Sequence, residues 1–425
     1  MCIRDRAIIG LGYVGLPLAV EFAKYTDVIG YDINPNRIAE LKNATDMTLE
    51  VASLELQAIE KSILFTCNQD ELADSNFYII TVPTPINKNN EPDMSYLIEA
   101  SKFIGSILKE GDFIVYESTV YPGATREICI PILSSTSGLQ LNKNYFVGYS
   151  PERINPGDVH HRLTDIVKIT SGSNQFAADE VDKVYSKIIT AGTHMASSIE
   201  IAEAAKVIEN TQRDLNIALV NELALILQKM NIDTTEVIEA ASTKWNFSSF
   251  YPGLVGGHCI GVDPYYLTYK AKALGHDPQV ILSGRELNDS MPSHVALILK
   301  NKMNDLMYQI DDSNILVLGF TFKENCPDIR NTKVSDLAVE LESMGANIFI
   351  HDPVMDLSLA RTSYKDLKFL ESPELKSYDA VIVAVAHLDF ITLGKTNISS
   401  YLKNNRSLIF DLKSAFDLDE FSFRL

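Results

Sequence analysis

The stretch Arg6-Ala-Ile-Ile-Gly-Leu-Gly-Tyr-Val-Gly15 begins the first regular structure of the chain. Its apolar start predicts a short buried strand, which runs directly into a GxGxxG pattern. An amphipathic helix is expected to about Tyr25, followed by a second strand, Val28-Ile-Gly-Tyr31. Glycines at these places permit a tight turn and let the backbone approach a pyrophosphate at the helix N-terminus. The whole strand–helix–strand pattern therefore predicts a dinucleotide-binding Rossmann unit, which the glycines alone would not.

A carboxylate, Asp32, follows the second strand of this unit. It stands at the spacing expected for a residue that binds a ribose 2′-hydroxyl, and its charge would repel the 2′-phosphate of NADP. The pattern therefore predicts NAD as the cofactor. Arg37 is expected to stack on the adenine or to grip the ribose. The loop residues expected to contact the cofactor are Gly10, Gly12, Tyr13, Val14 and Gly15.

Polar side chains follow the next predicted strands, which cover residues 77–82, 113–118 and 145–149. These side chains are Thr84, Glu117, Thr119 and Glu152. The carboxyl ends of parallel strands face the crevice where such sheets bind ligands. Any one of these residues alone is more often a turn or cap residue. Their shared position favours a functional role, with Thr84 and Thr119 at the cofactor.

Length and composition bound the class of protein. A chain of 425 residues is too long for one ordinary core and suggests two or three domains. Apolar residues at 46% and charged residues at 22% are values typical of globular proteins. The net charge of −19 argues against a nucleic-acid-binding protein, because phosphate backbones need a basic surface. An anionic small ligand needs only a few local cations and stays possible.

Cysteine usage and the chain start predict the compartment. The five cysteines are odd in number and lack CxxC spacing, which fits a reducing cytoplasm and no zinc or other metal site. No apolar run approaches the roughly eighteen residues of a membrane span. The first six residues carry no apolar signal region, so we expect a cytoplasmic protein, and we give these residues no structural weight.

A long helix is predicted over residues 197–230, which contain no glycine or proline before the end of the run. Ser197 and Glu200 have the spacing of a capping box. Residues 217–227 are apolar nearly all round, so we expect this half to be buried on several sides, as a connector between domains that also packs against a second copy of the chain. Lys206, Asn210 and Arg213 share one helix face. Such a face is usually solvated, and only proximity to a reactive group would make it catalytic.

The segment Gly253-Leu-Val-Gly-Gly-His-Cys-Ile-Gly-Val-Asp-Pro-Tyr-Tyr-Leu267 is the predicted reaction centre. Glycines at this density let the backbone approach a ligand closely. A reachable Cys259 beside His258 can be held partly as thiolate, the nucleophilic form. Taken alone, such a stretch is more often a glycine-rich turn with a small packing cysteine. The other motifs of the chain, described below, favour a catalytic cysteine over a packing one.

A second alternating unit begins near residue 313. Its predicted strands cover residues 315–319, 347–352, 379–386 and 407–411, with a helix near 333–344. It lacks the GxGxxG pattern, so we expect it to bind a different ligand. Its first loop offers Lys323 and Arg330 to a phosphate, whereas Cys326 is expected to be buried. Arg285 is a candidate contact to the nucleotide or to a neighbouring subunit.

Seven short motifs occur in order along the chain: Gly10-Leu-Gly-Tyr-Val-Gly15, Val82-Pro-Thr-Pro85, Glu117-Ser-Thr119, Ser150-Pro-Glu152, Glu203-Ala-Ala-Lys206 with Asn210, Gly256-Gly-His-Cys259 with Asp263, and Gly319-Phe-Thr-Phe-Lys323 with Asp328 and Arg330. In these motifs the chain resembles the UDP-glucose/UDP-N-acetylhexosamine 6-dehydrogenases, a family of nucleotide-sugar dehydrogenases. The resemblance extends over essentially the full length from Ala7 onward.

The resemblance implies oxidation of a primary alcohol, C6 of the sugar, to a carboxylate, with hydride transfer to two NAD⁺. By resemblance, a water held by Asp263 and Lys206 takes the proton in the first oxidation. Cys259 then attacks the aldehyde and gives a thiohemiacetal. A nucleophile is needed here, because an aldehyde has no second hydride to give until it becomes tetrahedral.

The same resemblance assigns the release of the product. The second oxidation leaves a thioester, which water hydrolyses with Glu152 as general base. Lys206 and Asn210 are expected to stabilise the oxyanion, and Thr119 to help order the water.

The substrate follows from the branch of the family that the chain resembles. His258, the Ile-Gly-Val-Asp-Pro sequence after Cys259, Ser150-Pro-Glu-Arg-Ile-Asn-Pro-Gly157 and His161-Arg-Leu163 resemble the N-acetylhexosamine branch, similar to the dehydrogenases of Vi-polysaccharide and O-antigen biosynthesis. UDP-N-acetylglucosamine and UDP-N-acetylgalactosamine are the expected substrates, with UDP-N-acetylmannosamine and UDP-glucose as alternatives. The product would feed capsule or O-antigen assembly. The expected substrate-binding residues are Glu152, Arg153, Lys206, Asn210, Arg213, Gly256, Gly257, His258, Lys323 and Arg330.

The predicted architecture is an α/β protein with two doubly wound Rossmann-like domains joined by a long central helix. We expect an NAD-binding domain over residues 1–196, a helical dimerisation and catalytic domain over 197–300, and a UDP-sugar-binding domain over 301–425, assembled as a homodimer. Two other functions remain open. A one-step dehydrogenase of the hydroxyacid or phosphogluconate type would need no cysteine. A non-catalytic protein would bind NAD or a nucleotide sugar without turnover.

Overall fold

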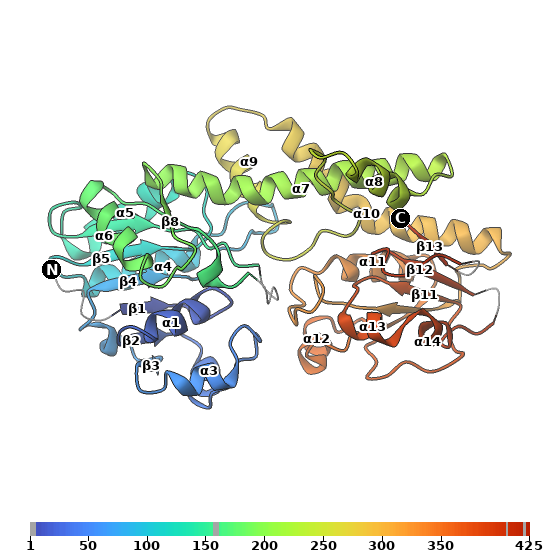
Figure 1. Ribbon diagram of the computed structural model, residues 1–425, viewed down its shortest axis with the longest axis horizontal. Helices are drawn as coiled ribbons and strands as arrows, with labels where there is room; N and C mark the ends of the chain where they lie inside the picture. Colours follow the sequence, from blue (N-terminus) through green and yellow to red (C-terminus); the bar gives the residue numbers. More distant parts are fainter. Residues whose placement is uncertain (1–5, 156–160, 405–406, 420–421) are drawn as a thin grey trace. The chain divides into compact units, whose positions relative to one another are not determined.

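The computed structural model describes residues 6–155, 161–404, 407–419 and 422–425. Residues 1–5, with Cys2, and the last two residues of the predicted Ser150–Gly157 motif lie outside the described residues. The chain divides into two compact units, Met1–Asn210 with Val262–Asp277, and Thr211–Gly261 with Pro278–Leu425. Figure 1 shows the strands of the first unit in blue to green and those of the second in orange to red. None of the helices in the described ranges has the length and apolar character needed to cross a membrane.

The first unit alternates strands and helices. Its strands are β1 (Arg6–Ile9), β2 (Val28–Tyr31), β3 (Ile63–Thr66), β4 (Phe77–Ile80), β5 (Phe113–Tyr116), β6 (Phe146–Tyr149), β7 (Lys168–Thr170) and β8 (Thr193–Met195). Its helices are α1 (Gly15–Ala23), α2 (Pro35–Lys42), α3 (Ser53–Ala58), α4 (Ser95–Ile107), α5 (Ile130–Ser137), α6 (Gln175–Tyr185) and α9 (Asp263–Ala273). Short turns η1 (Gln69–Leu72), η2 (Thr125–Cys129) and η3 (Leu163–Asp165) complete it.

The main sheet of this unit has the parallel order β3-β2-β1-β4-β5-β6. Successive residues of β4 enter opposite cores. Phe77 and Ile79 pack with residues of α1 and α6, whereas Tyr78 and Ile80 pack with residues of α4 and α5. Helices therefore cover both faces, and the strand order reverses between β1 and β4. Ligands of such sheets bind at the carboxyl ends of the strands at that reversal.

The second unit repeats the architecture in a shorter form. Its strands are β9 (Asn314–Leu318), β10 (Asn347–His351), β11 (Ala380–Val383), β12 (Leu408–Asp411) and β13 (Ser422–Arg424). Its helices are α8 (Thr234–Ser242), α10 (Gln279–Asp305), α11 (Lys333–Ser343), α12 (Leu357–Ser363), α13 (Leu388–Leu393) and α14 (Lys395–Ser399). The sheet is parallel, with the order β10-β9-β11-β12-β13. The predicted fold class, two doubly wound units with a long helix in the connection, is confirmed.

The long helix α7 (Ile199–Lys229) begins in the first unit and ends in the second. The predicted capping box at Ser197 and Glu200 is wrong by one residue. The Ser198 hydroxyl accepts a hydrogen bond from the Ile201 N–H at 3.3 Å, because Ser198 directly precedes the first helical residue. Glu200 instead pairs with Arg126 at 2.5 Å.

The second half of α7 carries an exposed apolar face. Ala218, Val220 and Ala224 are buried within the second unit. The exposed residues of this face are Leu219, Leu223, Ile226 and Met230. The spacings of four and three residues place the first three along one side of the helix, and Met230 directly follows the helix end. We call these four residues the α7 apolar stripe.

In both units the first strand–helix loop begins with a glycine of positive φ and is held by a carboxylate. Gly10 after β1 has φ +96°, and Gly319 after β9 has φ +90°, a region that favours glycine. In the first unit the Leu11 N–H donates to the Asp32 carboxylate at 2.9 Å. In the second, the Phe320 N–H donates to the Asp352 carboxylate at 2.7 Å. A carboxylate at the end of the second strand therefore fixes each loop.

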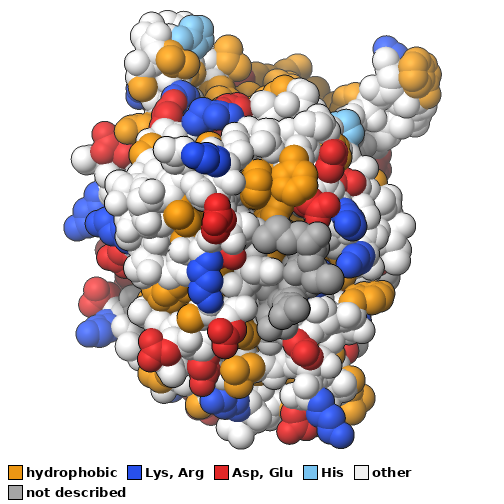
Figure 2. Space-filling view, turned by 90° about the vertical axis from the view of Figure 1, so that its left-hand side faces the viewer, with side chains coloured by type: hydrophobic (Ala, Val, Ile, Leu, Met, Phe, Trp, Pro, Cys, Tyr) orange, Lys and Arg blue, Asp and Glu red, His pale blue; other side chains and the backbone are white. Residues whose placement is uncertain are grey.

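Acidic and basic side chains are interspersed on the face of the molecule shown in Figure 2. In the described part of that face no broad patch of one sign stands out. The formal net charge of the whole chain is −19.

Replacing Gly319 should destabilise the second unit more than an equally strained glycine elsewhere. An alanine Cβ at Gly319 would lie 2.5 Å from the Val385 Cβ. Gly394 is the matched control, since its φ is +78° and an added Cβ would meet nothing within 4 Å. In both alanine variants, backbone strain should lower the free energy of unfolding by about 1 kcal/mol. In Gly319→Ala, overpacking should lower it by a further ~1–3 kcal/mol. Thermal unfolding measures this, and equal losses in the two variants would contradict it.

Candidate active site

The loop after β1 has the shape of a phosphate-binding loop. An added Cβ at Gly15 would lie 1.8 Å from the Gly10 carbonyl oxygen, so the helix start packs directly on the turn. Gly12 is exposed, and a Cβ there would meet nothing within 4 Å, so its backbone is open to a ligand. The N-terminus of α1 follows at Gly15 and favours an anion. These residues fit a dinucleotide pyrophosphate.

Asp32 and Arg37 support the same loop from opposite sides. One Asp32 oxygen accepts the Leu11 N–H, and the other accepts the Asn34 N–H at 2.9 Å. Arg37 is buried, and its Nε donates to the Leu11 carbonyl at 2.8 Å. Its guanidinium also pairs with Asp46 at 2.9 Å. Arg37 thus holds the loop through a backbone contact, a role that sequence reasoning did not assign to it.

The polar residues at the carboxyl ends of the middle strands do meet. The Thr84 hydroxyl donates to the Thr119 carbonyl at 2.7 Å, which joins the loops after β4 and β5. The Ser118 hydroxyl donates to the Val82 carbonyl at 2.6 Å. The Tyr266 hydroxyl of α9 donates to the Thr84 carbonyl at 2.6 Å. The two predicted threonines therefore lie at one edge of the sheet, beside α9.

Glu117 and Glu152 lie at the same edge and share one buried lysine. Lys168 of β7 donates to Glu117 at 2.7 Å and to Glu152 at 3.4 Å. Burial raises the pKa of Glu117 to about 7, against the opposing effect of Lys168. Burial would lower the pKa of Lys168, but the two carboxylates outweigh it and raise that pKa above its ordinary value.

Lys206, Asn210 and Asp263 form a second buried polar group in the first unit. The Asn210 amide donates to the Asp263 carboxylate at 2.6 Å. Burial raises the pKa of Asp263 to about 6, although Lys206 and Asn210 favour the ionised form. All three side chains are buried, whereas Arg213, the third residue of the predicted face, is exposed. The predicted face therefore divides into a buried part and a solvated part.

The Cys259 loop lies in the second unit, and its backbone is held mainly by the side chains of two asparagines. The Gly257 N–H donates to the Asn331 carbonyl at 3.0 Å, and the Asn331 amide donates to the Gly257 carbonyl at 2.7 Å. At the start of the loop, the Gly253 N–H and carbonyl both bond to the side chain of Asn221, at 2.8 and 3.1 Å. Cys259 itself is partly exposed. Two asparagine side chains thus fix the loop while its thiol stays accessible.

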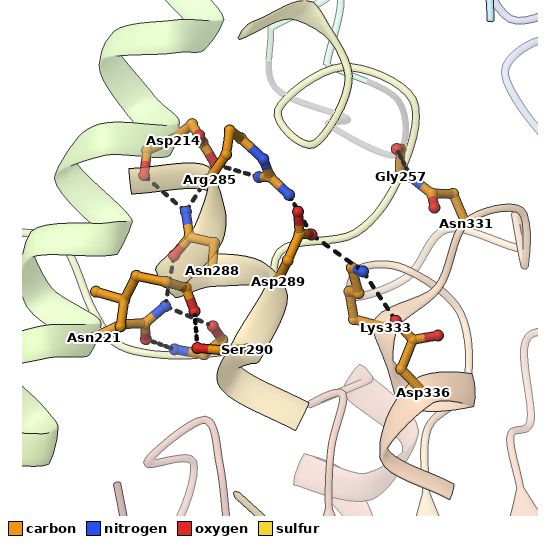
Figure 3. Close-up of polar contacts among 12 residues, drawn as sticks. Asp214, Asn221, Gly257, Arg285, Asn288, Asp289, Ser290, Asn331, Lys333 and Asp336 are labelled. Atoms are coloured by element: carbon orange, nitrogen blue, oxygen red, sulfur yellow. Dashed lines mark hydrogen bonds and ion pairs between the residues drawn. The ribbon is translucent and has the colours of Figure 1, made fainter. Parts of the chain in front are cut away.

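A buried network links α7 to α10 beneath this loop (Figure 3). Asn221 donates to Asn288 at 2.9 Å, and Asn288 donates to Asp214 at 2.7 Å. Arg285 donates to Asp214 and to Asp289, both at 2.6 Å. The expectation that Arg285 contacts a nucleotide or another subunit is therefore wrong for its fully buried guanidinium, which finds its partners within the unit.

The remaining predicted residues of this unit lie around the loop after β9. One Asp328 oxygen lies 3.4 Å from the His258 Nε2 and accepts a hydrogen bond from Arg330 at 2.6 Å. Burial opposes ionisation of Asp328, but these two contacts outweigh it and hold its pKa below the ordinary range. A pocket opens beside them at the carboxyl ends of β9 and β11, where the strand order reverses. Its lining includes Gly256, Thr321, Phe322, Lys323, Val385 and Lys413.

Sequence reasoning missed the residues that position the reactive groups. Lys168 is a charged residue inside an apolar strand, and Asn221 is an amide inside an apolar helix. A polar residue in such a place needs a partner, which is the signal that was available. The partners of Lys168 stand 51 and 16 residues away, so spacing alone does not name them. Cys326 is buried, as expected.

Three segments of the chain match the UDP-glucose/GDP-mannose dehydrogenase family. Residues 5–189 match its NAD binding domain, residues 200–290 its central domain, and residues 316–418 its UDP binding domain. The candidate dinucleotide loop falls in the first segment, Lys206, Asp263 and Cys259 in the second, and the pocket beside β9 mainly in the third.

Known relatives cover the whole chain. It is 52% identical over 419 residues to the UDP-N-acetyl-D-glucosamine 6-dehydrogenase of Pseudomonas aeruginosa, covering 99% of each chain. It is 53% identical to the enzyme of that name from Salmonella typhi, covering 99% of this chain and 98% of the relative. The structure of a UDP-D-ManNAc dehydrogenase from Pyrococcus horikoshii superposes with a TM-score of 0.88 at 28% identity, covering 99% and 98% of the two chains.

The charge of Asp32 should set the cofactor preference. In Asp32→Asn the amide oxygen still accepts the Leu11 N–H, but the charge that repels a 2′-phosphate is gone. We expect the preference for NAD over NADP to fall by about tenfold or more, a loss of ~1.4 kcal/mol. Titration of NADH and NADPH by fluorescence measures both affinities. An unchanged ratio would show that another residue reads the ribose.

Proposed function

Because this chain belongs to the UDP-glucose/GDP-mannose dehydrogenase family, we propose that it oxidises C6 of a UDP-N-acetylhexosamine to the carboxylate. NAD is the cofactor, and when bound it accepts a hydride in each of the two oxidations. The observation that carries the proposal is the buried Asn210–Asp263 pair beside Lys206, with Cys259 four residues before Asp263 in the chain.

Asp263 and Lys206 would prepare the first oxidation. With a pKa of about 6, Asp263 is mostly ionised at neutral pH and can hold a water that takes the C6 hydroxyl proton. The Asn210 amide fixes one carboxylate oxygen, which leaves the other for that water. The Lys206 ammonium, together with the amide, would stabilise negative charge on the substrate oxygen, an effect worth several kcal/mol when donors are preorganised.

Cys259 would carry the second oxidation. Its thiolate adds to the aldehyde carbon, which makes that carbon tetrahedral and able to lose a hydride. The resulting thioester is hydrolysed by water with Glu152 as general base. Glu152 is supported in this role by its buried position at the strand edge that also holds Thr84 and Thr119.

The second unit would bind the UDP part of the substrate. The pocket beside β9 lies where doubly wound sheets bind nucleotides, and Lys323 and Lys413 supply positive charge there. His258 and Arg330 both engage Asp328, so we propose that they shape this end of the pocket. We keep the division into NAD-binding, central and UDP-sugar-binding domains over residues 1–196, 197–300 and 301–425 as part of the proposal.

The gluco configuration is favoured by the relatives. Identity is 52–53% to two enzymes named for UDP-N-acetyl-D-glucosamine and 28% to the structure named for UDP-D-ManNAc. The product would serve polysaccharide synthesis. We place the enzyme in the cytoplasm, where a reducing environment keeps Cys259 as the thiol that the mechanism requires.

An activity panel tests the substrate. We expect UDP-N-acetylglucosamine or its galacto epimer to exceed UDP-N-acetylmannosamine and UDP-glucose by about tenfold or more in kcat/KM. NADH absorbance follows each reaction. A preference for UDP-glucose would leave the mechanism intact and overturn the assignment to N-acetylated sugars.

Replacing the thiol should stop acid formation. Cys259→Ser should still bind NAD and the sugar nucleotide but lose at least about a hundredfold in the rate of uronic acid release, because a serine hydroxyl without a base is a weak nucleophile. Cys67→Ser, at an exposed cysteine, is the control and should keep full activity. Near wild-type turnover in Cys259→Ser would rule out the covalent step.

We propose that the α7 apolar stripe is covered by a second copy of the chain, which gives a homodimer. Leu223 is 41% exposed in the single chain, so Leu223→Glu should fold but dissociate. Val339→Glu, at an exposed position of α11, is the control and should leave the assembly unchanged. Light scattering at micromolar concentration distinguishes the two. A wild-type monomer, or a dimer that survives Leu223→Glu, would contradict this interface.

A further inference from the structure

Lys168 is a buried lysine between two carboxylates. Its side chain is 2% exposed, that of Glu117 is fully buried, and that of Glu152 is 7% exposed. The Nζ atom lies 2.7 Å from Glu117, 3.4 Å from Glu152 and 5.6 Å from the centre of the Tyr185 ring. The Tyr185 hydroxyl donates to the second Glu117 oxygen. One positive charge is therefore shared by two acidic groups in a site that water does not reach freely.

The fold fixes the members of this group independently of one another. Glu117 follows β5, Glu152 follows β6, Lys168 begins β7, and Tyr185 ends α6. Strands β5 and β6 pair directly in the main sheet, so their carboxyl ends stay in register. The Ser150 hydroxyl, two residues before Glu152, donates to the Ile169 carbonyl at 2.7 Å and ties the end of β6 to β7. The main sheet therefore positions Glu117 and the start of the loop that carries Glu152, and the Ser150–Ile169 hydrogen bond ties that loop to β7, which pairs with β8 in a separate small sheet.

The contacts of Glu152 leave one acceptor position open. A carboxylate has about four acceptor sites. One Glu152 oxygen accepts the N–H groups of Arg153 and Ile154. The other accepts from Lys168. Among the described residues, this second oxygen has one site left, which is the site that a general base needs for water.

We propose that Lys168 is a positioning residue for Glu152, which it orients and keeps ionised for hydrolysis of the Cys259 thioester, while Glu117 shares the ammonium and limits how strongly it holds Glu152. This inference rests on the proposed function, because it assumes that Glu152 acts on a thioester. Neither Lys168 nor Glu117 touches the reacting atoms.

The step assisted in this way is a simple acyl transfer to water. Glu152 takes one proton from water as the water oxygen bonds to the thioester carbon. The carbon–sulfur bond then breaks and the Cys259 thiolate leaves. The carboxylic acid that forms gives its proton, the second proton of the attacking water, to solvent, and the sugar carboxylate is released. This step involves no oxidation or reduction. A protonated Glu152 cannot perform it, so the charge balance around Glu152 sets the lowest pH at which hydrolysis runs.

Lys168 and Glu117 should have opposite effects on the lowest pH at which hydrolysis runs. The ammonium favours the ionised form of Glu152, whereas the Glu117 carboxylate opposes it and competes for the ammonium. Within the described part of the chain, the other titratable or charged groups near this site include Tyr185, which bonds Glu117, buried Tyr149, whose pKa burial raises and the Glu117 charge raises further, and Arg153, whose guanidinium pairs with Glu209 of α7 at 2.6 Å. The Arg153–Glu209 pair involves neither Lys168 nor Glu117 and should remain in both substitutions, whereas in Glu117→Gln the Tyr185 hydroxyl can donate to the amide oxygen.

A purely structural ion pair would behave differently. Its loss would lower stability and would slow all steps equally at every pH, because the fold around the site would loosen. Removal of one partner from a buried pair often has that effect. The pH dependence of thioester hydrolysis, measured apart from the oxidations, distinguishes the two cases.

A pH-jump experiment isolates the hydrolysis. Enzyme is mixed with NAD and a limiting amount of UDP-N-acetylglucosamine at pH 5, where the acyl adduct on Cys259 should accumulate. The mixture is then jumped to pH values between 5.5 and 9, and loss of the adduct is followed by quenched flow and intact mass spectrometry. The variants are Lys168→Met, Lys168→Arg, Glu117→Gln, and the double variant Lys168→Met with Glu117→Gln.

We expect each variant to differ in the lowest pH at which it hydrolyses the thioester, which we call the acid limit. Lys168→Met should move the acid limit of hydrolysis upward by about one pH unit, a tenfold slower rate on the acid side. Glu117→Gln should move it downward, and Lys168→Arg should restore the wild-type limit. The double variant keeps the net charge of the group and removes the unpaired buried carboxylate. If Lys168→Met alone fails to fold, the double variant is compared with Glu117→Gln, and its acid limit should be higher than that of Glu117→Gln because only the ammonium differs between the two.

Three outcomes would overturn the inference. The first is an acid limit of hydrolysis that stays in place in Glu117→Gln and does not rise when Lys168 is replaced by Met, alone or together with Glu117→Gln, even if the rate is lower at all pH values. The second is an upward shift in Glu117→Gln. The third is the absence of any adduct in the wild-type enzyme, which would also remove the covalent mechanism. In the first two cases the proposed function stands, and only the role of Lys168 and Glu117 fails.

Discussion

A carboxylate at the end of the second strand holds the first strand–helix loop in both units. Asp32 accepts the Leu11 N–H, and Asp352 accepts the N–H groups of Phe320 and Thr321. The glycine before each loop turns the chain with a positive φ, so these N–H groups point at the carboxylate. Each ligand region depends on this contact, because the loop lies at the reversal of strand order. In the first unit Gly12 of the loop leaves its backbone open to a ligand, whereas in the second a buried histidine, His387, bonds Asp352 at 2.9 Å.

The candidate reactive groups are charges kept in buried surroundings. Burial raises the pKa of Asp263 to about 6 and that of Glu117 to about 7, against the effect of a neighbouring lysine in each case. Asp263, which has the lower pKa of the two, is mostly ionised at neutral pH and still able to take a proton, as a general base must, whereas Glu117 acts only as a neighbour of Glu152. Isolated buried charges are costly, which explains why each one has a lysine or amide partner. The hydrogen bonds that preserve the fold here are the same ones that adjust the chemistry.

Much of this organisation could be predicted from sequence. The GxGxxG loop, the apolar strands of both sheets and the Gly-rich stretch around Cys259 are local patterns, and local patterns indicate local structure. The long-range contacts of a residue cannot be predicted from such local patterns. Lys168 reads as a charged residue in a strand, and its contacts with Glu117 and Glu152 appear only when β5, β6 and β7 are placed together. Arg285 reads as an exposed cation, yet Asp214 and Asp289 bury it within its own unit. The observed cap of α7 is Ser198 and not the predicted Ser197. Two adjacent serines have the same propensity to cap a helix, so the sequence alone does not distinguish them.

The central claim is that one active site carries out two successive oxidations through a covalent intermediate on Cys259. The most direct test is the stoichiometry of a complete reaction with limiting UDP-N-acetylglucosamine and excess NAD. NADH is counted by absorbance, and the sugar product is identified by mass spectrometry. The account predicts two NADH for each sugar nucleotide consumed, with a uronic acid as product. One NADH for each sugar with a carbonyl product, or binding of both ligands without any NADH, would contradict it.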